Sequence, residues 1–210
     1  MAASSIFITL IDWTPFLAAG FLRNLLIAIL AMIFGTVIGV GLGRLRQGRI
    51  QIAGAAAGGL TSLARNVPSF VLMFYVAFLL PVEVSFGDTV FQFPTWIKAT
   101  IALTIPVVGF ASDQFKGYIR QKQEGIASAA PMFWVAWVQY FLIILMASST
   151  ASVIGADEIV GRANRVVATD NDPALLIATY AYVAIWFLVA GSLVSRYGPR
   201  LAKRLTKKGA

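Results

Sequence analysis

The sequence has no cysteine and no histidine among its 210 residues, and only 12% of its residues are charged. The absence of cysteine excludes disulfides and thiol chemistry. The absence of histidine removes imidazole acid–base catalysis and the commonest ligand of zinc and haem. A soluble protein carries roughly 25% charged residues, so about half of the expected solvating side chains are missing. We therefore expect no catalytic residues, no bound metal and no enzymatic activity in this chain.

What the chain has in abundance is apolar sequence, with 59% hydrophobic residues and a mean hydropathy of +0.80. A hydrocarbon core of about 30 Å needs roughly 20 apolar residues in a helix, and five stretches are long enough. They predict an all-α integral membrane protein in which residues 1–210 form a single transmembrane domain. The predicted spans cover residues 16–42, 52–80, 97–115, 132–154 and 174–194.

The net charge of +8 is distributed unevenly. Basic residues gather after the first span, between the third and fourth, and after the fifth, whereas the other connections are mostly acidic. The positive-inside rule then places the N-terminus outside and the C-terminus in the cytoplasm. This pattern favours contact of the basic C-terminal tail with anionic lipid over binding of nucleic acid. The three basic sets are Arg44, Arg46 and Arg49; Lys116, Arg120 and Lys122; and Arg196, Arg200, Lys203, Arg204, Lys207 and Lys208.

A few charged residues fall within or beside the apolar runs, where burial in lipid is costly. Arg65 is followed by Asn66 and Pro68, and this combination predicts an irregular segment that lines a cavity or a subunit contact. Asp113 lies one helical turn before Lys116, so it could pair locally or contact a ligand. Arg23 lies near the outer end of its span and can extend its side chain to the membrane surface.

Polar residues also occur in the fourth span, namely Gln139, Ser148, Ser149 and Thr150. Hydroxyl groups in a helix often bond back to carbonyls of the same helix, so this run has two open interpretations. It either lines a polar pathway or is structural. In the first span, glycines recur every fourth residue at Gly35, Gly39 and Gly43, which predicts close packing against another helix.

Three segments resemble the permease subunits of ABC importers for polar amino acids, of the histidine, arginine and glutamine type. Residues 20–49 are similar to the first helix of that family and its glycine-rich exit. Residues 63–81, LARNVPSFVLMFYVAFLLP, resemble the second-helix motif in which Arg-Gly-Thr-Pro precedes an aromatic span that ends in Leu-Pro. Residues 152–166, SVIGADEIVGRANRV, are similar to a periplasmic stretch that reads Ser-Val-Ile-Gly-x-x-Glu-Leu-x-x-x-Ala.

The resemblance is weakest in the cytoplasmic loop that docks on the ATPase in this family. There the family reads Arg-Gly and later Gly-Gln-x-Glu-Ala-Ala. Lys116 and Gly117 stand for Arg-Gly, and residues 125–130 read GIASAA, with Ile126 and Ser128 at the positions of the Gln and the Glu. The remainder of the docking loop is missing, so the loop is shortened. The residues that the resemblance assigns to ATPase coupling are Lys116, Gly117, Gly125, Ala129 and Ala130.

The resemblance implies a multi-pass protein of the bacterial inner membrane that forms half of a translocation pathway for a polar amino acid or related small solute. It implies an ATPase dimer that uses ATP and Mg²⁺, a periplasmic substrate-binding protein and a second permease, with no cofactor held by this chain. The shortened loop favours a heterodimer with a more complete permease over a homodimer. The alternative is a non-transporting scaffold or regulator descended from such a permease. The candidate pathway residues are Arg65, Asn66, Gln139, Ser148, Ser149 and Thr150.

Overall fold

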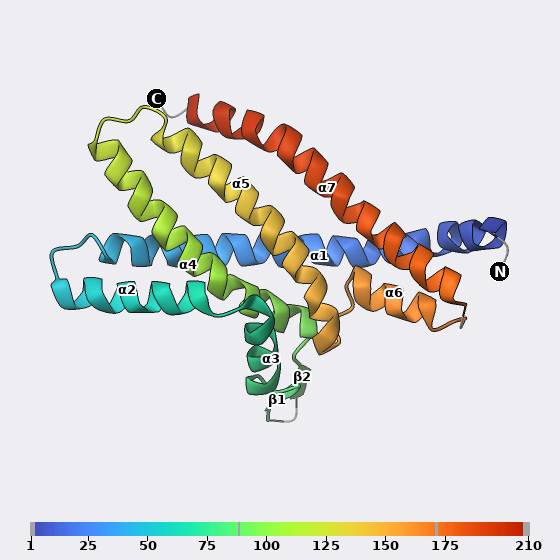
Figure 1. The fold of residues 1–210 in the computed structure, drawn as a ribbon. Coiled ribbons are helices and arrows are strands. Elements are labelled where there is room, and N and C mark those ends of the chain that lie inside the picture. The colour runs from blue at the N-terminus through green and yellow to red at the C-terminus, as the bar shows by residue number, and fades with distance from the viewer. Residues whose placement is uncertain (1–2, 88, 171, 208–210) are drawn as a thin grey trace.

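The computed structural model describes residues 3–87, 89–170 and 172–207, and these segments are almost entirely helical (Figure 1). Short connections join the helices, and a small two-stranded hairpin separates α3 from α4. The elements in chain order are α1 (Ala3–Leu45), α2 (Gln51–Asn66), α3 (Ser69–Leu79), β1 (Glu83–Phe86), β2 (Thr89–Gln92), α4 (Thr95–Gln123), α5 (Ala129–Ala147), the 3₁₀ helix η1 (Ser148–Ile154), α6 (Ile159–Val167) and α7 (Pro173–Lys207).

Four stretches of helix are long and apolar enough to cross a membrane: Ser5–Leu45, Thr95–Gln123, Ala129–Ile154 and Pro173–Gly198. They contain the predicted first, third, fourth and fifth spans. The second predicted span, residues 52–80, is broken at the irregular segment that the sequence predicted. It consists of α2 and α3, which are bent by 101° relative to each other, so a fifth span is present only if the bent pair crosses as a unit.

The bend between α2 and α3 lies where the sequence predicted an irregular segment. Val67 ends α2 with an extended backbone, φ −82° and ψ 125°, and Pro68 precedes the first residue of α3. The proline ring clashes with a helical conformation of the preceding residue, which explains the extended backbone of Val67. This break leaves Arg65 and Asn66 in the last turn of α2, directly before the elbow between α2 and α3.

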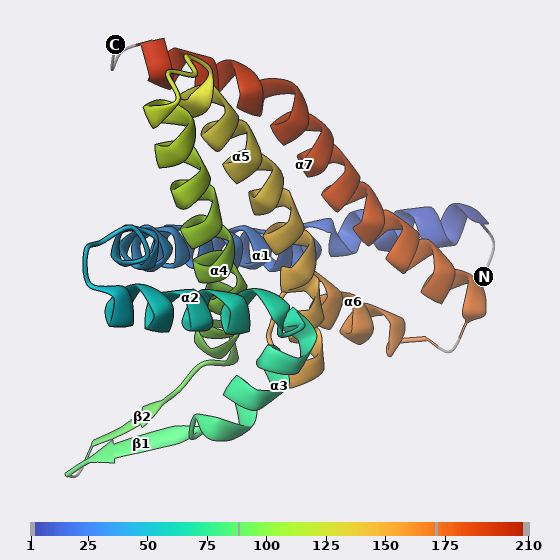
Figure 2. The same cartoon turned by 60° about the vertical axis from the view of Figure 1, so that its left-hand side comes forward.

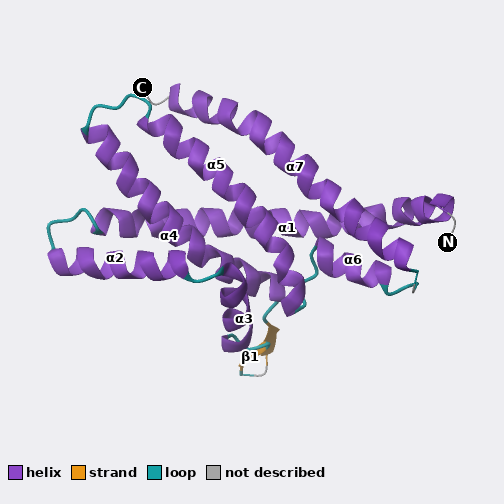
Figure 3. Ribbon diagram, in the orientation of Figure 1, coloured by secondary structure: helices purple, strands orange, loops and turns teal. Residues whose placement is uncertain are grey.

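The hairpin corrects the expectation of an all-helical chain. Its strands pair antiparallel, with Glu83 opposite Gln92 and Phe86 opposite Thr89, and Gly87 in the turn has φ +60°. Figure 2 shows that the hairpin projects away from the helices, and Figure 3 shows its position below α3. Two strands of four residues give too little alternation to be recognised in the sequence, and their pairing depends on a turn rather than on a buried face.

The centre of the molecule is the crossing of α1 and α4. Gly39 allows this crossing, because a Cβ atom there would lie 2.6 Å from the Val108 carbonyl oxygen and 2.7 Å from Ala111 Cβ. Gly35 and Gly43 face α4 in the same way, so the predicted packing of this glycine face is confirmed. The core around the crossing includes Ile27, Ala31, Met32, Ala99, Ala102 and Leu103.

The other helices are arranged around this crossing. The helix α2 runs back beside α1, and α5 and α7 extend in the same general direction as α4 (Figures 1 and 2). The short helix α6 packs against the N-terminal half of α1, where Gly20 leaves room for the backbone of Ile159. The C-terminal ends of α1, α4 and α7 lie on the opposite side of the molecule from α6 and the hairpin (Figure 1).

Candidate functional site

Arg65, one of the charged residues that the sequence singled out, forms an ion pair with Asp113 of α4. The Arg65 Nη1 atom lies 2.7 Å from Asp113 Oδ2, and Arg46 Nη1, from the turn after α1, lies 2.6 Å from Asp113 Oδ1. One carboxylate therefore joins three segments of the chain. Of the two alternatives that the sequence left open for Asp113, local pairing with Lys116 is absent among the described residues, because Asp113 of α4 pairs with these two arginines.

Two hydroxyl residues extend this group of charges. The Ser112 hydroxyl accepts a hydrogen bond from Arg46 Nη1 at 3.1 Å and lies 2.9 Å from the Thr61 hydroxyl of α2. The helices α2 and α4 can approach each other this closely because Gly109 of α4 has no side chain. A Cβ there would lie 2.8 Å from the Arg65 backbone nitrogen. We call Arg46, Thr61, Arg65, Ser112 and Asp113 the elbow cluster.

The elbow cluster carries one more positive than negative charge. Arg46 is mostly buried, with 16% of its side chain exposed, whereas the Arg65 side chain is 57% exposed. Arg65 uses only Nη1 in its bond to Asp113. The exposed remainder of its guanidinium group can therefore donate hydrogen bonds to a second anion, and a carboxylate is the natural partner for its planar geometry.

The other predicted pathway residues lie elsewhere. Asn66 is exposed beside Arg65, and Gln139 is exposed on α5. The Ser149 and Thr150 hydroxyls donate to the carbonyls of Met146 and Ala147, each at 2.7 Å. Within the described segments, none of the hydrogen bonds joins Gln139, Ser149 or Thr150 to the elbow cluster. Their role in a pathway stays a prediction.

Ser149 also lines a cavity of about 640 Å³ between α5 and α7. The facing wall contains Gly191, Ser192 and Ser195 of α7, whereas Met146, Phe187 and Leu188 make the rest of the lining largely apolar. Three serine hydroxyls in an apolar cavity are compatible with both interpretations of the polar residues in the fourth span. This cavity is separate from the contacts of Arg65.

Ser148 belongs to a buried polar cluster that the sequence analysis missed. Asn24 of α1 donates from Nδ2 to the Ser148 hydroxyl at 2.9 Å and to Glu158 Oε2 at 3.0 Å, and its Oδ1 accepts from the Ile159 backbone N–H at 3.0 Å. Asn24, Ser148 and Glu158 are each completely buried. We call these three residues the Asn24 cluster, and it joins α1 to η1 and to α6.

Glu158 is also the N-cap of α6. Its two carboxylate oxygens accept hydrogen bonds from the backbone N–H groups of Val160 at 2.9 Å and of Gly161 at 2.7 Å. Burial raises the pKa of Glu158 above its ordinary value, although the hydrogen bonds from Val160, Asn24 and Gly161 oppose this shift. The sequence contained a signal for this residue. Glu158 lies in residues 152–166, the segment that resembles the periplasmic stretch of the permease family, three positions after the SVIG run.

The neighbouring carboxylate, Asp157, faces three arginines. Arg162 binds it through Nε and Nη2 at 3.2 and 2.6 Å, Arg165 lies at 2.8 Å, and Arg23 lies at 3.6 Å. Burial acts to raise the pKa of Asp157, but the Arg162 hydrogen bond and the charges of Arg162, Arg165 and Arg23 together lower it below the ordinary value. Arg162 also donates to the Phe16 carbonyl at 2.7 Å, so this group fixes α6 on α1.

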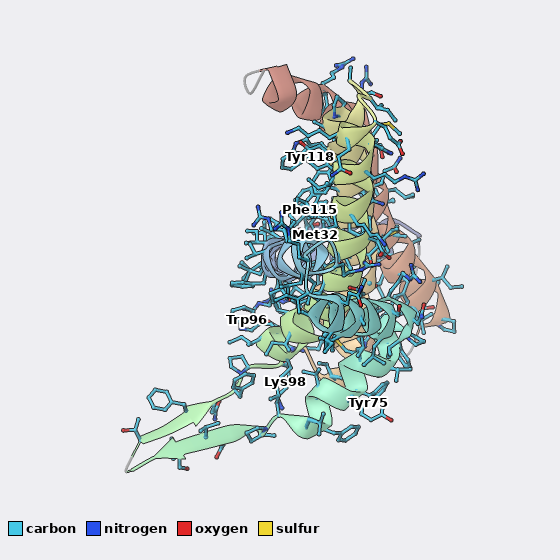
Figure 4. The ribbon with its side chains drawn as sticks, turned by 90° about the vertical axis from the view of Figure 1, so that its left-hand side faces the viewer. Met32, Tyr75, Trp96, Lys98, Phe115 and Tyr118 are labelled. Atoms are coloured by element: carbon cyan, nitrogen blue, oxygen red, sulfur yellow. The ribbon has the colours of Figure 1, made fainter. Side chains whose placement is uncertain are left out.

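Lys98, at the start of the third predicted span, is a buried charge that the sequence did not single out. Only 4% of the residue is exposed, and Figure 4 shows that its side chain extends from α4 towards α3. Its Nζ atom donates to the carbonyls of Leu80 at 2.8 Å and Ala77 at 3.2 Å. A cation there satisfies the free carbonyls at the end of α3 and interacts favourably with the helix dipole. Lys98 therefore holds α3 against α4.

The residues assigned to ATPase coupling surround the connection between α4 and α5. Lys116 and Gly117 lie within α4, Ala129 and Ala130 begin α5, and residues 124–128 form a tight turn in which Gly125 has φ +75°. No separate helix forms between α4 and α5, and the role of these residues in coupling stays a prediction. Gly117 and Ala129 line a small cleft of about 170 Å³ in this helical hairpin.

Replacing Asp113 with alanine tests the elbow cluster. Loss of the carboxylate leaves the mostly buried Arg46 without its counter-ion, and a hydrogen bond to a charged group contributes about 1.5–3 kcal/mol. We expect the free energy of unfolding to fall by about 2 kcal/mol, because Asp113 and Arg65 are partly solvated. Thermal unfolding of the purified protein in detergent measures the change. Asp113→Asn keeps an acceptor and should lose less, and equal stability of all three proteins would contradict this role.

Comparisons with known proteins agree with this architecture. No family model and no curated protein sequence matches the chain. Among solved structures, one titled as an amino acid ABC transporter with histidines superimposes with a TM-score of 0.70 and 17% identity, over 92% of this chain and 98% of that one. An inward-facing structure of the MetNI methionine ABC transporter gives a TM-score of 0.62 and 16% identity, over 92% and 97%.

A selenomethionine-soaked crystal of MetNI gives a TM-score of 0.64 at 14% identity, again over 92% of this chain and 97% of that one. The similarity therefore covers the order and placement of the helices along nearly the whole chain, although few residues are shared. The described helices and their apolar sequences are those of a multi-pass membrane protein. This chain has the fold of amino acid ABC transporter chains, built from helices that are long and apolar enough to cross a membrane.

Proposed function

We propose that this chain is the transmembrane permease subunit of an ATP-driven ABC importer and forms half of the translocation pathway for a polar amino acid or related small solute. The observation that supports this proposal is the fold, which matches an amino acid ABC transporter chain at a TM-score of 0.70 over almost the full length of both chains. In this proposal the chain binds no cofactor, and a separate ATPase dimer uses ATP and Mg²⁺.

The proposed orientation has the N-terminus in the periplasm and the C-terminus in the cytoplasm of a bacterial inner membrane. The basic residues that follow α1, end α4 and end α7 support it, because these three ends lie on one side of the molecule (Figure 1). The hairpin, α6 and the Asn24 cluster are then on the periplasmic side. A periplasmic substrate-binding protein would deliver solute to this side.

Within this proposal, Arg65 binds the carboxylate of the solute. Its support is the exposed guanidinium group at the elbow, held in place by Asp113, and the extra positive charge of the elbow cluster. Asn66, Gln139, Ser148, Ser149 and Thr150 are proposed as further pathway residues that offer neutral hydrogen bonds. Of these, Asn66 is the exposed neighbour of Arg65 on α2.

Uptake into proteoliposomes tests this role of Arg65. One charge-assisted hydrogen bond contributes about 1.5–3 kcal/mol, so Arg65→Gln should raise the KM for a carboxylate-bearing solute by about tenfold or more. Arg49→Gln is the matched control, since Arg49 is an exposed arginine in the turn after α1. The assay uses the complex purified with its partners. Unchanged KM and rate for Arg65→Gln would refute the assignment.

The partner is proposed to be a second, different permease. The tight turn between α4 and α5 supports a mixed dimer, because an importer transmits closure of its ATPase through a rigid docking element. In a mixed dimer, the more complete partner could carry most of this coupling. Isolation of a stable homodimer of this chain that hydrolyses ATP in response to solute would contradict the mixed dimer.

The same turn favours a second candidate function, a non-transporting scaffold or regulator of the same fold. The two candidates differ in their relation to the ATPase. A permease subunit co-purifies with an ATPase whose hydrolysis increases when solute is added. A scaffold leaves hydrolysis unchanged by solute, whether or not the ATPase is retained. Measuring ATP hydrolysis of the purified assembly with and without a panel of polar amino acids separates them.

A further inference from the structure

A large apolar groove lies between α1, α5 and α7, apart from the elbow cluster and from the cavity that contains Ser149. Its volume is about 820 Å³, which is within the range of about 300–1,000 Å³ that small-molecule sites occupy. Its walls are built from Ile29 and Ile33 of α1, Trp137 and Phe141 of α5, and Leu193 of α7. Neither the elbow cluster nor the Asn24 cluster has a residue in this lining.

The walls of the groove present hydrocarbon. Ile33 and Leu193 are 49% and 52% exposed, so these wall residues face the outside of the molecule rather than its core. The indole N–H of Trp137 donates to the Thr36 hydroxyl at 2.9 Å, which satisfies the polar group of that ring. A ligand along these walls therefore meets aliphatic and aromatic surface.

One end of the groove is cationic. Arg200 is the charged residue in the lining, and its guanidinium carbon lies 5.8 Å from the centre of the Tyr197 ring. Within the described ranges, Arg200 has no carboxylate at ion-pair distance, in contrast to Arg46, Arg65, Arg162 and Arg165. Gly198 lets α7 approach Val138 of α5 at this end. The groove thus combines an apolar channel with an unpaired arginine beside a tyrosine.

We propose that this groove binds an anionic phospholipid, with an acyl chain along the apolar walls and the phosphate at Arg200. Arginine binds phosphate through several parallel hydrogen bonds, and tyrosine and arginine are typical of the level of the headgroups. The sequence beyond Arg200 continues with Lys203, Arg204, Lys207 and Lys208. Such a basic run attracts the anionic lipids of the cytoplasmic leaflet. This site requires only that the chain spans a membrane, so it is independent of transport.

Native mass spectrometry of the full-length protein tests the site. The protein is reconstituted with equal amounts of phosphatidylglycerol and phosphatidylcholine and then released in mild detergent. We expect the wild type to retain phosphatidylglycerol at least about tenfold over phosphatidylcholine, which is the effect of roughly 1.4 kcal/mol. Arg200→Gln should lose this preference. Arg196→Gln is the control, because Arg196 is exposed on α7 one turn earlier but does not line the groove.

A second measurement reports on the acyl chain. In a variant that keeps Trp137 and replaces the other tryptophans with phenylalanine, brominated phosphatidylglycerol should quench Trp137 fluorescence more strongly than brominated phosphatidylcholine. Leu193→Trp, made separately, fills the groove at an exposed position and should reduce lipid retention without unfolding the chain.

Three results would overturn the proposal. Equal retention of both lipids by the wild type would show that the groove does not select the anionic headgroup. Equal loss in Arg200→Gln and Arg196→Gln would show that the basic residues attract anionic lipid without a specific site. If a helix of a second copy fills the groove instead, Arg200→Gln should leave lipid retention unchanged and Leu193→Trp should dissociate a dimer.

Discussion

Asn24→Ala is expected to lower the free energy of unfolding by about 3 kcal/mol, because it removes three hydrogen bonds from the Asn24 cluster. The Ile159 N–H group loses its acceptor, and the buried Glu158 carboxylate loses a donor. Each buried polar group left without a partner costs about 1–3 kcal/mol, and more when it is charged. Thermal and denaturant unfolding of the purified protein in detergent measures the loss.

The effect of Asn24→Ala should also depend on pH. The Asn24 hydrogen bond stabilises the charged form of Glu158, so its loss raises the pKa of Glu158 further above the unfolded value. When the pKa of a carboxyl group is raised in the folded state, the folded protein loses stability as the pH rises from the unfolded-state pKa of that group to its folded-state pKa. The variant should therefore be more strongly destabilised at pH 8 than at pH 5. A cost that is small at both pH values would contradict the structural role of the Asn24 cluster.

Gly39→Leu is expected to separate α1 from α4 and to cost more than about 3 kcal/mol, because the new side chain has no space. A Cβ at this position already lies 2.6 Å from the Val108 carbonyl oxygen, which is backbone and cannot rotate away. Overpacking of a core costs about 1–3 kcal/mol when neighbouring side chains can adjust, and more when they cannot. The yield of monodisperse protein in size-exclusion chromatography and its unfolding temperature measure the effect.

Gly41→Leu is the matched control for this substitution. Gly41 lies on the same helix two residues later, and a Cβ there has no atom within 4 Å besides the backbone of its own helix and its chain neighbours. Both substitutions carry the same change in helix propensity and hydrophobicity, so only the contact with α4 differs. Similar behaviour of the two variants would mean that the α1–α4 crossing is not needed for the fold.

The periodicity and length of the apolar runs were enough to predict most of the helical frame. Four of the predicted spans lie within long apolar helices, and the glycine spacing in α1 correctly indicated a helix contact. The bend was also predicted in place, since Pro68 restricts the backbone of Val67 whatever surrounds it. The angle of 101° was not predictable, because it depends on how α2 packs against α4.

The candidate site was less predictable, because its partners are distant in the sequence. Arg65 and Asp113 were singled out separately as charges of opposite sign, and their mutual ion pair appears only when α4 crosses α2. Asn24 and Lys98 were missed because a single polar residue in or beside an apolar run carries no sign of its partner. Asn24 and Glu158 are 134 positions apart, yet the fold brings them to 3.0 Å.

By itself, the sequence determined that this protein is a multi-pass helical membrane protein without cysteine or histidine chemistry, because hydropathy, composition and helix-breaking prolines act locally along the chain. Only the tertiary structure decided which charges pair, which polar residues are buried and which helices enclose the apolar groove. The reason is that costly charges in an apolar environment need partners, and those partners come from segments that are brought together only by helix packing. Arg65 was visible in the sequence, but Asp113 and Arg46 became its neighbours through the fold.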